Sequence, residues 1–151
     1  MEFKSEVQRK CFERVVGIAE TIKEQKNLVG RVSDKSPRYI LQRGSTYVFI
    51  DVEAFSDQAA MVQVRSFVAI RPRMEVELLE TLLRENASWG GCPSFGIKDG
   101  SIVLDCSFLS GGAESDQLFY AVEVVSENAD TWDDLLVEKF GGRRASDPPM
   151  S

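Results

Sequence analysis

The sequence contains no histidine, only three cysteines and no long apolar run. Without histidine, Ser-His-Asp and Cys-His nucleophile systems and histidine metal sites are excluded. No apolar stretch approaches the roughly 18 to 20 residues that a transmembrane helix needs. The first residues also lack the apolar core of a secretory signal. We therefore expect a cytoplasmic protein that does not associate with membranes.

The three cysteines, Cys11, Cys92 and Cys106, have no CxxC spacing. An odd number in a cytosolic chain argues against a disulfide framework. Cys11 and Cys106 fall on apolar faces, where each is expected to be a small buried hydrophobe. Cys92 lies in a Gly-Gly-Cys-Pro turn, and a reactive thiol there is the alternative to a merely exposed one.

Basic residues are outnumbered, because 18 Lys and Arg face 24 Asp and Glu, for a net charge of −6. This balance opposes non-specific binding to nucleic acid or anionic lipid, so neither is an expected partner. The glycines form no GxGxxG or Walker motif, and Asp130–Asp134 lacks the pattern of a calcium loop. We expect no cofactor, no metal and no enzymatic activity; a small carboxylate- or thiol-dependent enzyme is the alternative.

The stretch from Thr46 to Arg71 has the period-two alternation of half-buried strands. One face is aliphatic, with Val48, Ile50 and Val52 before a polar break and Val62, Val64, Val68 and Ile70 after it. The break at Ser56-Asp57-Gln58 predicts a hairpin. The opposite face mixes charge with Tyr47, Phe49, Phe55, Met61 and Phe67, which is more apolar surface than a solvated face requires.

Around this hairpin the sequence predicts three helices, near residues 3–28, 74–87 and 115–140, each with one apolar stripe. A further strand is expected at 38–43, joined to the central hairpin by the tight turn Gly44-Ser45. Strands at 93–98 and 101–109 flank Asp99-Gly100, a strong hairpin signal. The prediction is a single α+β domain over residues 1–142, of order α-β-β-β-α-β-β-α, with a twisted antiparallel sheet packed by helices. Residues 143–151 are expected to form a disordered tail.

This element order resembles the class I type III secretion chaperone fold, and more closely the YbjN-domain branch of that superfamily. The phrase from Ala129 to Leu135, Ala-Asp-Thr-Trp-Asp-Asp-Leu, leading into Phe140-Gly141-Gly142, is similar to the C-terminal helix of YbjN-like proteins. The resemblance covers residues 3–142. It implies that the first and third helices share one face of the sheet. In secretion chaperones the second helix and a nearby strand commonly form a homodimer, and an extended effector segment wraps the outside through apolar patches.

The leading hypothesis is a non-enzymatic, chaperone-like homodimer that holds a client segment on apolar sheet surface. The expected client contacts are Tyr47, Phe49, Phe55, Met61 and Phe67, since aromatic anchors can dominate binding energy. The second helix, or a dimer mate, could instead cover that face. The expected dimer contacts are Leu78 and Leu82, for which core burial is the competing interpretation. A regulatory or stress-linked dimeric scaffold without a client chain is the second functional hypothesis.

Overall fold

The structure, a computed structural model, describes residues 1–111 and 114–145. Within these ranges the chain forms three helices and six strands, in the following order. The elements are α1 (Glu6–Lys26), β1 (Val29–Val32), β2 (Arg38–Arg43), β3 (Thr46–Ala54), β4 (Ala60–Ala69), α2 (Val76–Trp89), β5 (Ser94–Lys98), β6 (Ser101–Leu109) and α3 (Glu114–Phe140). No helix in this part of the chain is both long and apolar enough to cross a membrane.

The strands form one antiparallel sheet in the order β1-β2-β3-β4-β6-β5, so β1 and β5 are its edges. The pairing register assigns residues to two faces. One row across four strands is apolar and buried, and consists of Tyr39, Ile50, Val64 and Cys106. The neighbouring row points to the other face and consists of Ile40, Phe49, Arg65 and Asp105.

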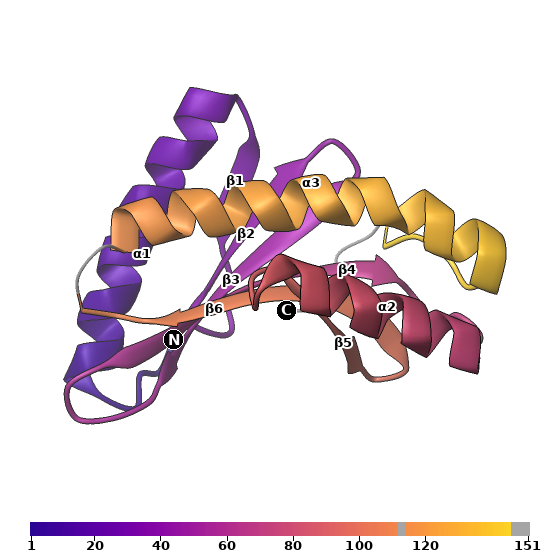
Figure 1. Ribbon diagram of the computed structural model, residues 1–151. Helices are drawn as coiled ribbons and strands as arrows, with labels where there is room; N and C mark the ends of the chain where they lie inside the picture. The colour runs from indigo at the N-terminus through magenta and orange to yellow at the C-terminus, as the bar shows by residue number, and fades with distance from the viewer. Residues whose placement is uncertain (112–113, 146–151) are drawn as a thin grey trace.

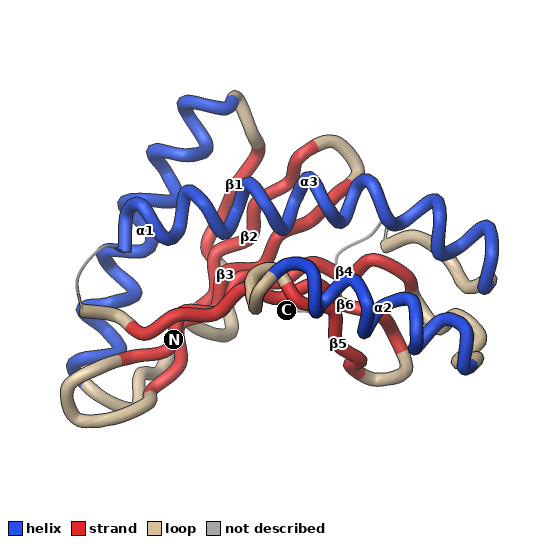
Figure 2. Tube along the Cα trace, in the orientation of Figure 1, coloured by secondary structure: helices blue, strands red, loops and turns tan. Residues whose placement is uncertain are grey.

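All three helices lie on the face that carries the apolar row (Figure 1). α3 runs across β3, β4 and β6, while α1 crosses β1 to β4 and packs against α3. α2 lies beside β5 (Figure 2). Its Leu78 and Leu82 join the same core as Phe95 of β5. The opposite face has no helix from the described residues over it. The α+β class, the antiparallel sheet and the first and third helices on one face agree with the predictions.

The ends of α1 show how local sequence sets an element's bounds. The Ser5 hydroxyl accepts a hydrogen bond of 3.1 Å from the amide of Gln8, which caps the helix N-terminus. At the other end Asn27 adopts a left-handed conformation with φ of 53°, as helix C-termini often require. Between them the buried stripe recurs at three- and four-residue steps, through Cys11, Val15, Ala19 and Ile22.

The strand β1 was not predicted, because the first strand expected from the sequence begins at residue 38. Its four residues alternate only weakly between exposed and half-buried, so they carry little hydrophobic signal. Pairing with β2 stabilises the strand. Gly30 allows the buried Tyr39 ring to lie close beneath it, since a Cβ there would lie 2.7 Å from the Tyr39 hydroxyl oxygen.

The chain after α3 returns to the sheet. Ile70 and Arg143 exchange backbone hydrogen bonds of 2.8 and 3.1 Å. Gly142, with φ of 79°, passes so close to Ile70 that a Cβ would lie 2.4 Å from the Ile70 carbonyl oxygen. The described chain therefore contacts the sheet at Arg143, one residue past the expected domain boundary at residue 142. Of the expected disordered tail, residues 146–151 lie outside the described residues.

Candidate functional site

The face of the sheet opposite the helices is here called the open sheet face. Its central residues are Arg38, Ile40, Tyr47, Phe49, Asp51, Met61, Gln63, Arg65, Phe67, Val103 and Asp105. This set combines aromatic rings, aliphatic side chains and four charged groups. It differs in composition from both the aliphatic core and an ordinary solvated surface.

Two ion pairs cross the middle of the open sheet face. Arg38 donates to Asp51 from Nε (2.6 Å to Oδ1) and Nη2 (3.1 Å to Oδ2). Arg65 does the same to Asp105, at 2.5 and 3.4 Å. The fork-to-carboxylate geometry makes both pairs bidentate and directional. All four side chains are at most one quarter exposed, so these pairs are held more firmly than ordinary surface salt bridges.

Phe49 lies beneath this polar middle. Its ring meets Phe67 edge-to-face with centroids 6.4 Å apart, and the Arg38 guanidinium lies 4.9 Å from its centroid. Both contacts are favourable for an aromatic ring. Phe49 is only 2% exposed. The expectation that it offers an exposed ring is therefore wrong in the monomer, because neighbouring side chains of its own face cover it.

The other expected client contacts remain at least partly accessible, but they do not form one patch. Tyr47 and Phe67 are half-buried near Phe49, while Met61 is half-buried six residues along β4 from Phe67. At about 3.3 Å per residue that separation is roughly 20 Å. Phe55, 59% exposed, follows β3 at the same end as Met61. The open sheet face thus has two apolar ends and a polar middle.

A second apolar area lies between α2 and the edge strand β5. The expected dimer contacts are inside it: Leu78 is fully buried and Leu82 is 5% exposed. The exposed side of α2 is formed one position further along the helix than Leu78 and Leu82. We call it the α2–β5 surface, formed by Val76, Leu79, Leu83 and Ile97. A pocket of about 310 Å³ opens there, with Leu82 and Phe95 among its lining residues.

Asn86 limits which backbone groups of the edge strand β5 are free to pair with another strand. Its side-chain amide donates to the Phe95 carbonyl oxygen (3.1 Å), and its oxygen accepts from the Phe95 amide (2.6 Å). The outward backbone groups of Phe95 are therefore already satisfied. Another strand cannot pair there without breaking these bonds. The α2–β5 surface can associate through side chains, but not through a continuous sheet across Phe95.

The structure corrects the expectation for two of the cysteines. Cys92 and Cys106 form a disulfide that ties the turn before β5 to β6, with Cα atoms 5.1 Å apart. Neither is the free thiol that odd counting suggested, and Cys92 is not available as a nucleophile in this state. Cys11 is free and buried in the core. Burial raises the pKa of its thiol, which lowers its reactivity.

No group of three or more His, Cys, Asp or Glu side chains in the described residues is placed to hold a metal ion. The residues that sequence reasoning missed at the site are the charged ones: Arg38, Asp51, Arg65 and Asp105. A signal existed for the first pair. The predicted two-residue turn Gly44-Ser45 sets Arg43 opposite Thr46, and counting back along both strands then sets Arg38 opposite Asp51.

Comparison with known proteins identifies a family and several relatives of the fold. The family model described as T3SS (YopN, CesT) and YbjN peptide-binding chaperone 1, or TY-Chap1, matches residues 15–148. A chain from the crystal structure of the ExsC–ExsE complex superposes with a TM-score of 0.55 at 12% identity, covering 83% of this chain and 95% of that one. At this identity the likeness is one of fold. No curated protein is significantly similar in sequence.

Proposed function

Because the chain belongs to the TY-Chap1 family of type III secretion and YbjN peptide-binding chaperones, we propose that it holds an extended segment of a client protein on the open sheet face. In this proposal two copies associate through the α2–β5 surface. The family match confirms the resemblance found in the sequence. Client and dimer partner would occupy different surfaces, so each half of the proposal can fail without the other.

The observation that carries client binding is the composition of the open sheet face. It has partly exposed apolar groups at both ends, separated by roughly 20 Å, and no helix of the described residues covers it. An extended peptide of about six residues spans that distance. Its apolar side chains would meet Tyr47 and Phe67 at one end and Met61 at the other. Its middle would lie over the two Arg–Asp pairs, which favours polar side chains there.

The open edge of the sheet supports main-chain pairing as a contribution to affinity. The backbone amide of Ser33 donates to the Arg38 carbonyl oxygen at 2.8 Å, so Ser33 and Arg38 form a hydrogen-bonded pair of the β1–β2 ladder. By the alternation of antiparallel ladders, the backbone groups of Gly30 and Val32 then point away from β2. A client strand could pair with these groups. The other edge is less suitable, because Asn86 occupies the groups of Phe95.

The dimer half of the proposal is supported by exposed aliphatic side chains. Val76 and Leu83 on α2 and Ile97 on β5 are each more than half exposed, around an apolar pocket. Contiguous apolar surface of this kind is typical of association sites.

A cytoplasmic location and the absence of catalysis belong to the same proposal.

The client test uses two equally exposed aromatic residues as a matched pair. Peptides of about 12 residues, enough to span the open sheet face, are selected from a random library on the immobilised protein. Their affinity is then measured by fluorescence anisotropy for the wild type, Phe55→Ser, Phe67→Ser and Tyr120→Ser. Phe55 is 59% exposed beside the open sheet face, and Tyr120 is 57% exposed on α3.

We expect Phe55→Ser and Phe67→Ser to weaken binding by about tenfold, as for aromatic anchors of moderate strength. Tyr120→Ser should match the wild type. Unchanged affinity in both open-face variants, with thermal unfolding also unchanged, would reject client binding on this face. Failure of the library to yield any binding peptide would favour the scaffold without a client.

The dimer test is the mass in solution, measured by light scattering over a range of concentrations. A lysine in place of Leu83 puts a charge into the α2–β5 surface and should shift a dimer to the monomer. Leu135→Lys changes a similarly exposed leucine on α3 and should leave the mass unchanged. A wild type that is monomeric at all concentrations would reject the dimer.

A further inference from the structure

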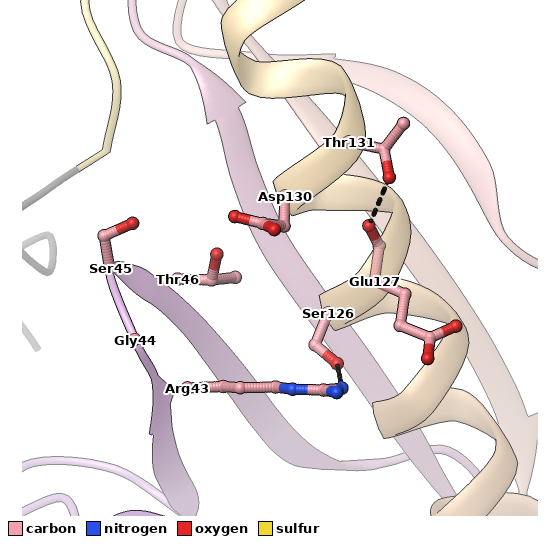
Figure 3. A pocket seen from close by; sticks show the side chains of 8 residues that line it. All are labelled: Arg43, Gly44, Ser45, Thr46, Ser126, Glu127, Asp130 and Thr131. Atoms are coloured by element: carbon pink, nitrogen blue, oxygen red, sulfur yellow. Dashed lines mark hydrogen bonds between the residues drawn. The ribbon is translucent and has the colours of Figure 1, made fainter.

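A polar pocket of about 570 Å³ lies between the β2–β3 turn and the middle of α3. Its lining residues are Arg43, Gly44, Ser45, Thr46, Ser126, Glu127, Asp130 and Thr131 (Figure 3). Gly44 has φ of 60°, as the first central residue of a type II′ hairpin turn requires. This tight turn places Arg43 and Thr46 opposite each other, directly beneath the helix.

The cationic end of the pocket is already engaged. Arg43 donates to the Ser126 hydroxyl at 3.0 Å and lies 3.6 Å from Glu123, which also pairs with Lys26 at 2.8 Å. The Lys26 ammonium and the Glu127 carboxyl lower the pKa of Glu123, and Glu123 in turn raises the pKa of Glu127. These groups form a closed network at one side of the pocket.

The opposite side has acceptors without partners. Thr46 is 7% exposed, yet its hydroxyl makes no hydrogen bond with any residue that the structure describes. The Asp130 carboxylate likewise has no hydrogen bond or ion pair within the described ranges. Figure 3 shows these two groups and the Ser45 hydroxyl directed into the same space. Ser45 and Asp130 are exposed, and the Thr46 hydroxyl oxygen is not a fully buried atom, so all three groups face the open pocket with their hydrogen-bonding capacity left unused by the described residues.

We propose that this pocket binds a primary ammonium group. An ammonium has three N–H donors and no acceptor, which matches the Asp130 carboxylate and the Thr46 and Ser45 hydroxyls one to one. The charge-assisted bond to Asp130 would supply most of the affinity. Such a group can come from a lysine side chain of a peptide or from a free polyamine.

Other ligand classes fit less well. A phosphate or carboxylate would meet Asp130 and Glu127, and the one guanidinium that could neutralise it is held by Ser126 and Glu123. A divalent metal would find a single unengaged carboxylate, whereas hard cations in proteins take several oxygen ligands. The inference goes beyond the proposed function, because the pocket lies on the helix-covered side of the sheet and needs no client on the open sheet face.

The test is a titration of the ¹⁵N-labelled full-length protein with Nα-acetyl-lysine methylamide, followed by amide chemical shifts. We expect saturable shifts concentrated at Ser45, Thr46 and Asp130. The Nε-acetylated form of the same probe has no charge and should give none. Spermidine forms the second arm: tighter binding of the lysine probe assigns the site to peptides, and tighter binding of spermidine assigns it to free polyamines.

Three variants test whether the probe binds in this pocket. Asp130→Asn should weaken binding about tenfold, and Thr46→Val about threefold, through loss of a charged and a neutral hydrogen bond respectively. Glu138→Gln removes one exposed carboxylate from the same helix outside the pocket, and should change affinity less than twofold. Equal losses in Asp130→Asn and Glu138→Gln, shifts spread over the acidic surface, or binding of the neutral probe would each overturn the proposal. None of these outcomes bears on client binding on the open sheet face.

Discussion

The two faces of the sheet are built from adjacent residues of the same strands, yet their apolar side chains are covered in different ways. The row Tyr39, Ile50, Val64, Cys106 is covered by helices and contains only the Tyr39 hydroxyl as a polar side-chain group. The next row, Ile40, Phe49, Arg65, Asp105, has no helix over it. Nevertheless Ile40 and Phe49 are 4% and 2% exposed, as buried as core residues.

This comparison shows that the open sheet face is not simply a solvated one. Its apolar side chains are covered by long side chains of the same face, as the Arg38 guanidinium over Phe49 illustrates. A cover made of side chains can move aside at much lower cost than a packed helix. A peptide can therefore reach the apolar groups without disrupting the core. The following predictions test this difference between a fixed and a movable cover.

The largest expected effect is on the free energy of unfolding, and it should differ between two isoleucines, one on each face. Ile50→Ala removes three carbons beneath packed helices and leaves a cavity, which should lower the free energy of unfolding by about 3 to 4 kcal/mol. Ile40→Ala removes the same atoms where neighbouring side chains can close the gap. Only the transfer term then remains, about 2 kcal/mol. Urea unfolding measures both. Equal losses would mean that the open sheet face is packed as rigidly as the covered one.

The covered face also has a covalent tie, which gives the next largest effect. The Cys92–Cys106 disulfide closes a loop with a sequence separation of 14 residues. A loop of that size corresponds to about 3 kcal/mol, so Cys92→Ser should lower the free energy of unfolding by that amount. The wild type in reductant should fall to the same value, while reductant should not affect the variant. A wild type insensitive to reductant would show that the bond does not form.

Most of the covered face could be predicted from sequence, because hydrophobic periodicity reports on burial against another layer. The aliphatic positions of β3 and β4 and the stripe of α1 were identified in this way. Periodicity also assigned Leu78 to the α2 stripe, but could not fix which edge of the stripe faces solvent. The exposed residues of α2 include Val76 and Leu83, and Leu83 lies one helical position from the buried Leu82.

The open sheet face was only partly predictable, since its burial depends on register between distant strands. The pairing of Arg65 with Asp105 joins β4 to β6 across the whole of α2, and no short-range signal specifies it. The same holds for Cys92 and Cys106, whose proximity follows from the β5–β6 hairpin together with the turn before it. Strand β1 has too little periodicity to be recognised before its partner is known.

The ion pairs give a smaller effect that sharpens the comparison. A double-mutant cycle with Arg65→Met and Asp105→Asn should return a coupling of about 1 kcal/mol, because the pair lies between the exposed and buried limits. Methionine retains an apolar stem over the face. The matched pair Arg84–Glu80, highly exposed with 4.0 Å between its closest charged atoms, should give about 0.3 kcal/mol. Equal coupling in the two pairs would show that the open-face charges are as loosely held as those on the surface.

The smallest effect is a pH dependence of the free energy of unfolding that arises from Tyr39 on the covered face. Burial, and then the hydrogen bond of 2.9 Å that its hydroxyl donates to Glu20, raise the pKa of Tyr39 above its usual value. Because the folded-state pKa is the higher one, the stabilisation is complete below about pH 10, the unfolded pKa, and is lost as the pH rises further. At pH 10.5 the wild type should have lost roughly 0.8 kcal/mol relative to its value at pH 8.

Tyr39→Phe keeps the ring but has no proton to lose, so its free energy of unfolding should lack this part of the alkaline decline. The measurement is the wild-type minus variant difference at pH 8 and at pH 10.5, since lysines and the other tyrosines contribute equally to both proteins. At pH 8 the difference itself should be about 1 kcal/mol, for the lost hydrogen bond. A difference independent of pH would mean that water reaches the Tyr39 hydroxyl. In that case the helix cover over this edge would be as movable as the cover on the open sheet face.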